Sequence, residues 1–238
     1  MKWIWTTLSI LICCAQPALA ANNINPSNFT GPSAQSDFRA FSEDLGSALS
    51  YKALAPPTPL GVTGFDMGVE ATGTKIRNLG VATNSSMGDL VVPKLHVEKG
   101  LPLNIDVGAF YSALPTTGVK LYGGELRYAI IPGGIATPAV GIRGAFSKMS
   151  GVNQLSLSTR SMDISISKGF AMFTPYAGVG SVWVSSAPIG TAGLANESFR
   201  QNKVFAGGDV NFGLANVDME YDKTGYASSY GVKLGFRF

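Results

Sequence analysis

The sequence predicts an all-β protein that folds as a single closed, antiparallel, transmembrane β-barrel of about ten strands. From Gly61 to the C-terminus, the chain divides into segments in which apolar and polar residues alternate, which is typical of strands whose two faces meet different media. Glycine makes up 29 of the 238 residues, well above its usual share of about 7%. No segment after residue 20 has the unbroken apolar length of a membrane-spanning helix. Because an open sheet in hydrocarbon would leave unpaired edges, the strands are expected to close.

Residues 1–20 have the pattern of a secretory signal peptide. The basic Lys2 precedes an apolar run, and the segment ends in Ala18-Leu19-Ala20, so we expect export and cleavage after Ala20. An uncleaved anchor is the alternative, but the apolar run is shorter than the ~20 residues that a span needs. Both cysteines, Cys13 and Cys14, lie here, so we expect no disulfide and no cysteine metal site in the exported chain.

Residues 21–60 are predicted to form a lead into the barrel. Residues 21–35 are rich in Asn, Pro, Ser and Ala and are expected to be disordered. A short amphipathic helix follows, and a proline-rich linker over residues 55–59 comes after it. This helix could lie as a flap against the periplasmic mouth or enter the lumen as a plug. The apolar residues of the proposed plug helix recur at three- and four-residue steps: Phe38, Phe41, Leu45 and Leu49.

The barrel itself is predicted to occupy residues 61–238. Ten strands satisfy the even number that bacterial barrels require, although eight or twelve strands stay possible. The ten alternating segments are 61–75, 89–98, 102–113, 118–130, 135–147, 154–168, 172–185, 201–213, 216–222 and 226–238.

The connections between these segments predict how the barrel is oriented. The longer ones, residues 76–88 and 186–200, both follow odd-numbered strands, whereas the connections after even-numbered strands are short. Membrane barrels have long extracellular loops and short periplasmic turns. The first strand is therefore expected to start in the periplasm, with the N-terminal helix capping that side.

The sixth segment changes phase. Leu155 and Leu157 share one parity, whereas Met162, Ile164 and Ile166 share the other. This shift predicts either a β-bulge or a strand that extends beyond the membrane.

The last strand ends on an apolar, aromatic-rich face at the C-terminal residue. The pattern resembles the final strand of Gram-negative outer-membrane β-barrels, and residues 61–238 resemble the small OmpA-like and OmpW-like barrels. The resemblance implies outer-membrane lipid and lipopolysaccharide as surroundings, and recognition by the barrel-assembly machinery. The residues that carry this C-terminal assembly signal are Tyr230, Val232, Leu234, Phe236 and Phe238.

The opposite parity of the strands places charged side chains in the lumen. Ions of both signs in a confined space are expected to pair, since an unpaired buried charge costs several kcal/mol. Closure of the first strand against the last should bring Asp66 close to Lys233 and Arg237. Such a network either fills and locks the barrel or lines a water-filled pore. The predicted lumen residues are Asp66, Glu70, Lys94, His96, Glu98, Asp106, Glu125, Arg127, Arg143, Lys203, Asp209, Asp218, Glu220, Lys233 and Arg237.

The sequence offers little support for catalysis, metals or cofactors. His96 is the only histidine, and no serine lies within four residues for it to activate. No metal-binding or dinucleotide motif is present, and a formal net charge of +3 gives no nucleic-acid footprint.

Together these patterns favour an envelope component or a narrow channel for small solutes, with the N-terminal helix as its candidate plug. The alternative is a surface adhesin or ligand-binding barrel that acts through the connections 76–88 and 186–200. The oligomeric state stays open.

Overall fold

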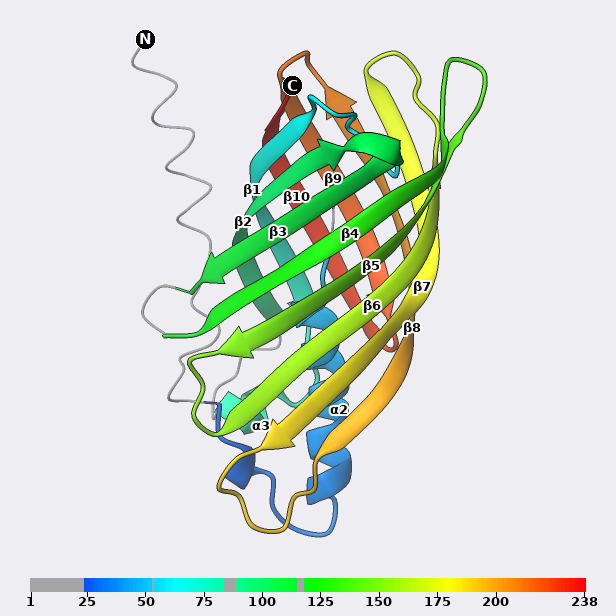
Figure 1. Cartoon of the computed structure of the whole chain (residues 1–238). Coiled ribbons are helices and arrows are strands. Elements are labelled where there is room, and N and C mark those ends of the chain that lie inside the picture. The colour runs from blue at the N-terminus through cyan, green and yellow to red at the C-terminus, as the bar shows by residue number, and fades with distance from the viewer. Residues whose placement is uncertain (1–23, 53, 84–88, 115–117) are drawn as a thin grey trace.

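Ten antiparallel strands form a closed barrel in the computed structural model, which describes residues 24–52, 54–83, 89–114 and 118–238 (Figure 1). Each strand pairs with its neighbours along the chain, and β1 pairs with β10 to complete the ring. The prediction of ten strands is confirmed. The strands are β1 (Phe65–Lys75), β2 (Asp89–Leu101), β3 (Ile105–Ala113), β4 (Lys120–Pro132), β5 (Ala139–Ser150), β6 (Leu155–Ser167), β7 (Phe173–Pro188), β8 (Glu197–Asn211), β9 (Ala215–Thr224) and β10 (Ala227–Arg237).

The outer surface of the barrel is apolar and the inner surface is largely polar. On β1, for example, Met67 and Val69 are exposed, whereas Asp66 and Glu70 are buried in the lumen. This alternation is what a strand between hydrocarbon and a closed interior requires, because every backbone group bonds to a neighbouring strand. Among the described residues, no helix is both long and apolar enough to span a membrane.

The two ends of the barrel differ, and we name them by their connections. At the turn mouth lie the C-terminus and the short connections after the even-numbered strands, one of which contains the helical turn η2 (Pro102–Asn104). At the loop mouth lie the connections after the odd-numbered strands, including α3 (Leu79–Thr83). Because β8 begins at Glu197, the connection after β7 spans residues 189–196 and is shorter than the sequence predicts.

The N-terminal segment lies at the loop mouth and inside the barrel. A helical turn, η1 (Pro26–Asn28), leads into helix α2 (Ala34–Leu49), which contacts β1, β5, β6, β7, β8 and β10 (Figure 1). The expected flap on the periplasmic side is therefore not found, because α2 occupies the mouth opposite the C-terminus. The disorder expected over residues 21–35 is not found in its described part, residues 24–35, where Ile24 and Phe29 are buried. The expected signal peptide lies outside the described residues.

Strand β6 has no bulge, so the first of the two structures predicted from its change of parity is not found. Its register with β5 and β7 is continuous, and Leu155 and Leu157 point inward like the polar residues further along the strand. The apolar pair faces the lumen because the lumen itself is apolar at that level, where α2 fills it. Among the described strand pairs, a register shift occurs between β4 and β5, at Ala129 and Ile131.

The seam between β1 and β10 is predicted to depend on Asp66, which accepts from Arg237 at 2.8 Å and pairs with Lys233 at 3.2 Å. We expect Asp66→Asn to lower the free energy of unfolding by about 3 kcal/mol, because two buried cations lose a partner. Urea titration of the protein in detergent micelles measures this. Asp89→Asn, at an exposed carboxylate on β2, should change it by less than about 0.5 kcal/mol; equal losses in the two variants would contradict the prediction.

Candidate functional site

The lumen is the candidate functional site, and it has two zones. Its loop half is lined by apolar side chains that pack around α2, and its turn half is lined by charges. The apolar zone forms one cluster with Phe38, Phe41, Leu45 and Leu49 of α2, which are almost completely buried. The wall residues of this cluster include Leu90, Val92, Leu121, Met149, Leu155, Leu157, Val182 and Val184.

The last two turns of α2 fit closely against β7. Gly46 faces Val184, and a Cβ at residue 46 would lie only 2.6 Å from one methyl group of that valine. One turn earlier, the hydroxyls of Ser42 and Ser186 are 3.0 Å apart. Glycine therefore permits the close approach of helix and strand, and the helix obstructs the loop half of the lumen.

Ion pairs and hydrogen bonds join α2 to residues at the loop mouth. Arg77, after β1, donates to Asp44 through Nε at 2.9 Å and Nη2 at 2.9 Å. These hydrogen bonds raise the pKa of the Arg77 guanidinium, so Arg77 stays charged over any physiological pH. Three strands away around the ring, Arg39 and Gln35 both donate to Glu197, the first residue of β8. The helix is thus held at two separate points of the loop mouth.

After α2, the chain continues through the lumen to the turn mouth. Tyr51 bonds to His96 through its hydroxyl and Nε2 at 2.6 Å, and the ammonium of Lys52 donates to Asp222 at 2.6 Å. Further on, the Thr58 and Ser167 hydroxyls are 3.2 Å apart, and the backbone N–H of Leu60 donates to Asp106 at 3.1 Å. Residues 24–60 therefore pass from one mouth to the other, and we call them the threaded segment.

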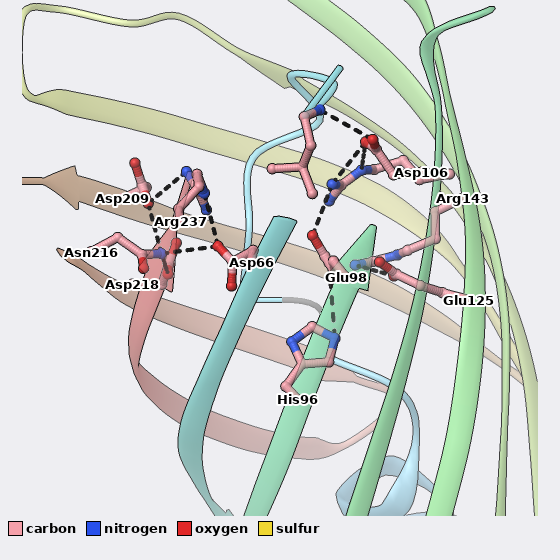
Figure 2. Close-up of polar contacts among 12 residues, drawn as sticks. Asp66, His96, Glu98, Asp106, Glu125, Arg143, Asp209, Asn216, Asp218 and Arg237 are labelled. Atoms are coloured by element: carbon pink, nitrogen blue, oxygen red, sulfur yellow. Dashed lines mark hydrogen bonds and ion pairs between the residues drawn. The ribbon is translucent and has the colours of Figure 1, made fainter. Parts of the chain in front are cut away.

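The charged wall forms two groups (Figure 2). In the first, at the β1–β10 seam, Asn216 donates to Asp218 at 2.8 Å, and Arg237 bridges Asp66 and Asp209. In the second, Arg127 bridges Glu98 and Asp106, both at 3.0 Å. Arg143 pairs there with Asp163 at 2.9 Å and Glu125 at 3.5 Å.

All fifteen predicted lumen residues point inward, and Arg237 is the only one of them that is partly exposed. The expected closeness of Asp66 to Lys233 and Arg237 is confirmed. Among the described residues, sequence analysis missed five buried charges: Lys52, Asp163 and Asp222 in the charged lumen, and Asp44 and Glu197 at the loop mouth. Asp163 and Asp222 have the inward parity of their strands and were detectable. Lys52 was not, because the position of the threaded segment carries no periodic signal.

The predicted C-terminal assembly signal lies outside the lumen network. The side chains of the C-terminal strand, such as Tyr230, Phe236 and Phe238, are exposed on the outer surface, and their role in assembly stays a prediction. At the turn mouth, a cavity of about 330 Å³ remains beneath the threaded segment, lined in part by Leu60, Arg127 and Arg237.

The sequence matches no protein-family model and no curated protein. Among solved structures, the N-terminal β-barrel domain of Pseudomonas aeruginosa OprF is similar with a TM-score of 0.40 and 15% identity over 75% of this chain and 99% of that chain. The KdgM porin has a TM-score of 0.38 and 10% sequence identity over 72% of this chain and 99% of that chain. Ail of Yersinia pestis, described as the attachment invasion locus protein, has a TM-score of 0.28 and 11% sequence identity over 74% of this chain and 97% of that chain.

The contact of Gly46 with Val184 generates a prediction about the plug. Gly46→Ala should lower the free energy of unfolding, since overpacking costs about 1–3 kcal/mol and outweighs the ~1 kcal/mol gained in helix propensity. Val184→Ala alone should also cost about 1–2 kcal/mol through lost packing. In the double variant, the alanine at 184 makes room for the new methyl group, so the combined loss should be smaller than the sum of the two.

A double-mutant cycle by urea unfolding in micelles measures this coupling. Gly144→Ala is the matched control, because its Cβ would meet no atom within 4 Å. Additive losses for Gly46→Ala and Val184→Ala would show that α2 does not seat against β7.

Proposed function

We propose that this protein is an outer-membrane channel for small solutes that its own threaded segment holds closed. The observation that carries the proposal is the passage of residues 24–60 through the lumen, with contacts from Ser42–Ser186 at the loop mouth to Leu60–Asp106 at the turn mouth. The location is supported by the apolar outer surface, the signal-peptide pattern and the aromatic C-terminal strand.

The charged wall supports a removable plug more than a permanently filled core. Most of its ion pairs join one strand to another, such as Arg127 to Glu98 and Arg143 to Asp163, and would persist without the threaded segment. The segment contributes a single lumen charge to the wall, Lys52, and its partner Asp222 also pairs with Lys203 at 3.6 Å. Withdrawal of the segment would therefore leave the charges of the turn half mostly paired and would uncover the apolar wall of the loop half.

The proposal assigns no catalysis to the lumen. His96 is 2% exposed and is enclosed by Tyr51, Glu70 and Glu98, so a substrate has no access to it in the closed barrel. We further propose that outer-membrane lipid and lipopolysaccharide surround the barrel, and that the barrel-assembly machinery recognises its last strand.

Single-channel recording in planar bilayers tests the proposal. The chain that begins at Ala21 should be silent or conduct in rare steps, whereas a chain without residues 21–60 should conduct in frequent, larger steps, because the apolar obstruction is gone. Mobility on an unheated denaturing gel checks that both forms are folded. If both are folded and inserted and neither conducts, the wall itself closes the lumen and the channel proposal fails.

A disulfide lock tests the same proposal in the full-length mature chain. The exported chain is expected to contain no cysteine, so Ser42→Cys with Ser186→Cys introduces a single pair where the hydroxyls are 3.0 Å apart. Any openings that the parent protein shows should disappear in the oxidised variant and return on reduction. Each single cysteine variant is the control. Openings that persist in the oxidised form would show that conduction does not require movement of α2.

A second candidate function is surface binding, which one observation favours. At the loop mouth, the threaded segment and the loops form an ordered cap: Asn25 donates its backbone N–H to Ala82 at 2.9 Å, and Asn28 donates to the backbone of Val81 at 3.1 Å. Such a cap would present a fixed surface to the outside of the cell. Whole-cell binding that survives the disulfide lock and is lost on replacement of residues 189–196 would support the adhesin function over the channel.

A further inference from the structure

Two glutamates converge over a glycine in the middle of the lumen wall. In the strand register, Glu98 of β2 lies opposite Gly108 of β3, which in turn lies opposite Glu125 of β4. A Cβ at residue 108 would lie 3.1 Å from Cγ of Glu98 and 3.0 Å from Cγ of Glu125. The absence of a side chain there therefore lets the two carboxylates reach over β3 toward one another.

His96 completes this group. It lies two residues before Glu98 on the same face of β2, and its Nε2 is 3.9 Å from Oε1 of Glu98 (Figure 2). Donor atoms of His96, Glu98 and Glu125 all lie within 4.8 Å of one another. The hydroxyl of Tyr51, 2.6 Å from the same imidazole nitrogen, brings an oxygen of the threaded segment to the edge of the group.

The carboxylate oxygens that face this point are buried and unsatisfied. Oε1 of Glu98 and both side-chain oxygens of Glu125 have no hydrogen-bond partner among the described residues, and the ion pair of Glu125 with Arg143 is long, at 3.5 Å from Oε2 to Nη1. Arg127 binds the other oxygen of Glu98, Oε2, at 3.0 Å and so leaves Oε1 free toward the histidine. An unsatisfied buried carboxylate oxygen is costly, and a proton or a cation would remove that cost.

The charge balance differs between the two sides of the lumen. On the far side, five described carboxylates face four bases, which leaves an excess of one negative charge. They are Asp66, Asp209, Asp218, Glu220 and Asp222 with Lys52, Lys203, Lys233 and Arg237. On this side, five described carboxylates face three bases, which leaves an excess of two negative charges. They are Glu70, Glu98, Asp106, Glu125 and Asp163 with Lys94, Arg127 and Arg143.

We propose that His96, Glu98 and Glu125 bind one divalent transition-metal ion, with Zn²⁺ as the best match. Its charge equals the local excess, and a neutral imidazole with two carboxylates is a donor set that zinc accepts, whereas Mg²⁺ and Ca²⁺ prefer oxygen ligands alone. Zinc–ligand distances of about 2.0–2.2 Å place neighbouring donors roughly 3.4 Å apart, so a modest inward movement of the side chains completes the site. Tyr51 or a water molecule supplies the fourth ligand.

Because Tyr51 belongs to the threaded segment, this ion would bind where the threaded segment contacts the barrel wall. Zinc competes with the Tyr51 hydroxyl for Nε2 of His96, or recruits that hydroxyl as a ligand. The site itself does not depend on the channel proposal, and its test requires no measurement of conductance.

Zinc titration of the purified mature protein tests the site. The protein is treated with chelator, folded in detergent micelles and titrated with Zn²⁺ alone by calorimetry. We expect one ion per chain, with affinity at least tenfold lower in His96→Gln and in Glu125→Gln. Glu220→Gln is the matched control, because it removes a buried lumen carboxylate that accepts from Tyr176 instead; its affinity should stay within twofold of the parent.

X-ray absorption at the zinc edge gives a second readout that needs only the parent protein. The expected spectrum shows nitrogen and oxygen neighbours at about 2.0–2.1 Å with an imidazole contribution. If a variant fails the gel test for folding, this spectrum decides. Absence of stoichiometric zinc, a spectrum without imidazole, or equal affinity in folded His96→Gln would overturn the proposal and leave bound protons as the source of charge balance.

Discussion

The closure of the barrel is the constraint from which the rest of this structure follows. In hydrocarbon every backbone N–H and C=O needs a partner within the protein, so β1 has to meet β10. Closure then separates two environments, and alternation along each strand sends apolar side chains outward and polar ones inward. Once charges are placed in a narrow interior, they need partners there, and the wall pairs of Asp66, Arg127 and Arg143 are the result.

The interior is not uniform, and its change in character explains the position of α2. Toward the turn mouth, inward positions carry charges that bond across strands. Toward the loop mouth, they carry residues such as Leu90, Leu155 and Val184, which have no favourable contact with water. An amphipathic helix with Phe41 and Leu45 on one face is the complementary filling for that zone. Wall and helix therefore bury each other's apolar surface.

This division also marks the limit of prediction from sequence. Strand number, closure and the inward parity of residues such as Asp66 and Lys233 follow from a period of two, which local sequence reports directly. The sequence places Leu155 and Leu157 of β6 out of phase because the rule used for strands assumes a polar lumen. Their inward orientation depends on α2, more than a hundred residues away. The path of Lys52 and the convergence of Glu98 and Glu125 over Gly108 likewise depend on contacts between segments and on register, which no local pattern encodes.

The direction of the threaded segment has a consequence for the order of assembly. Residue 24 lies at the loop mouth, whereas β1 starts at the turn mouth beside the C-terminus, so the chain runs through the ring before it begins to build it. Entry after closure would require residues 24–33 to unfold before they pass through the ring, whereas enclosure during closure requires no such passage, so we expect the sheet to curl around the segment. Pairing of β1 with β10 then leaves residue 24 and the C-terminus at opposite mouths of the barrel.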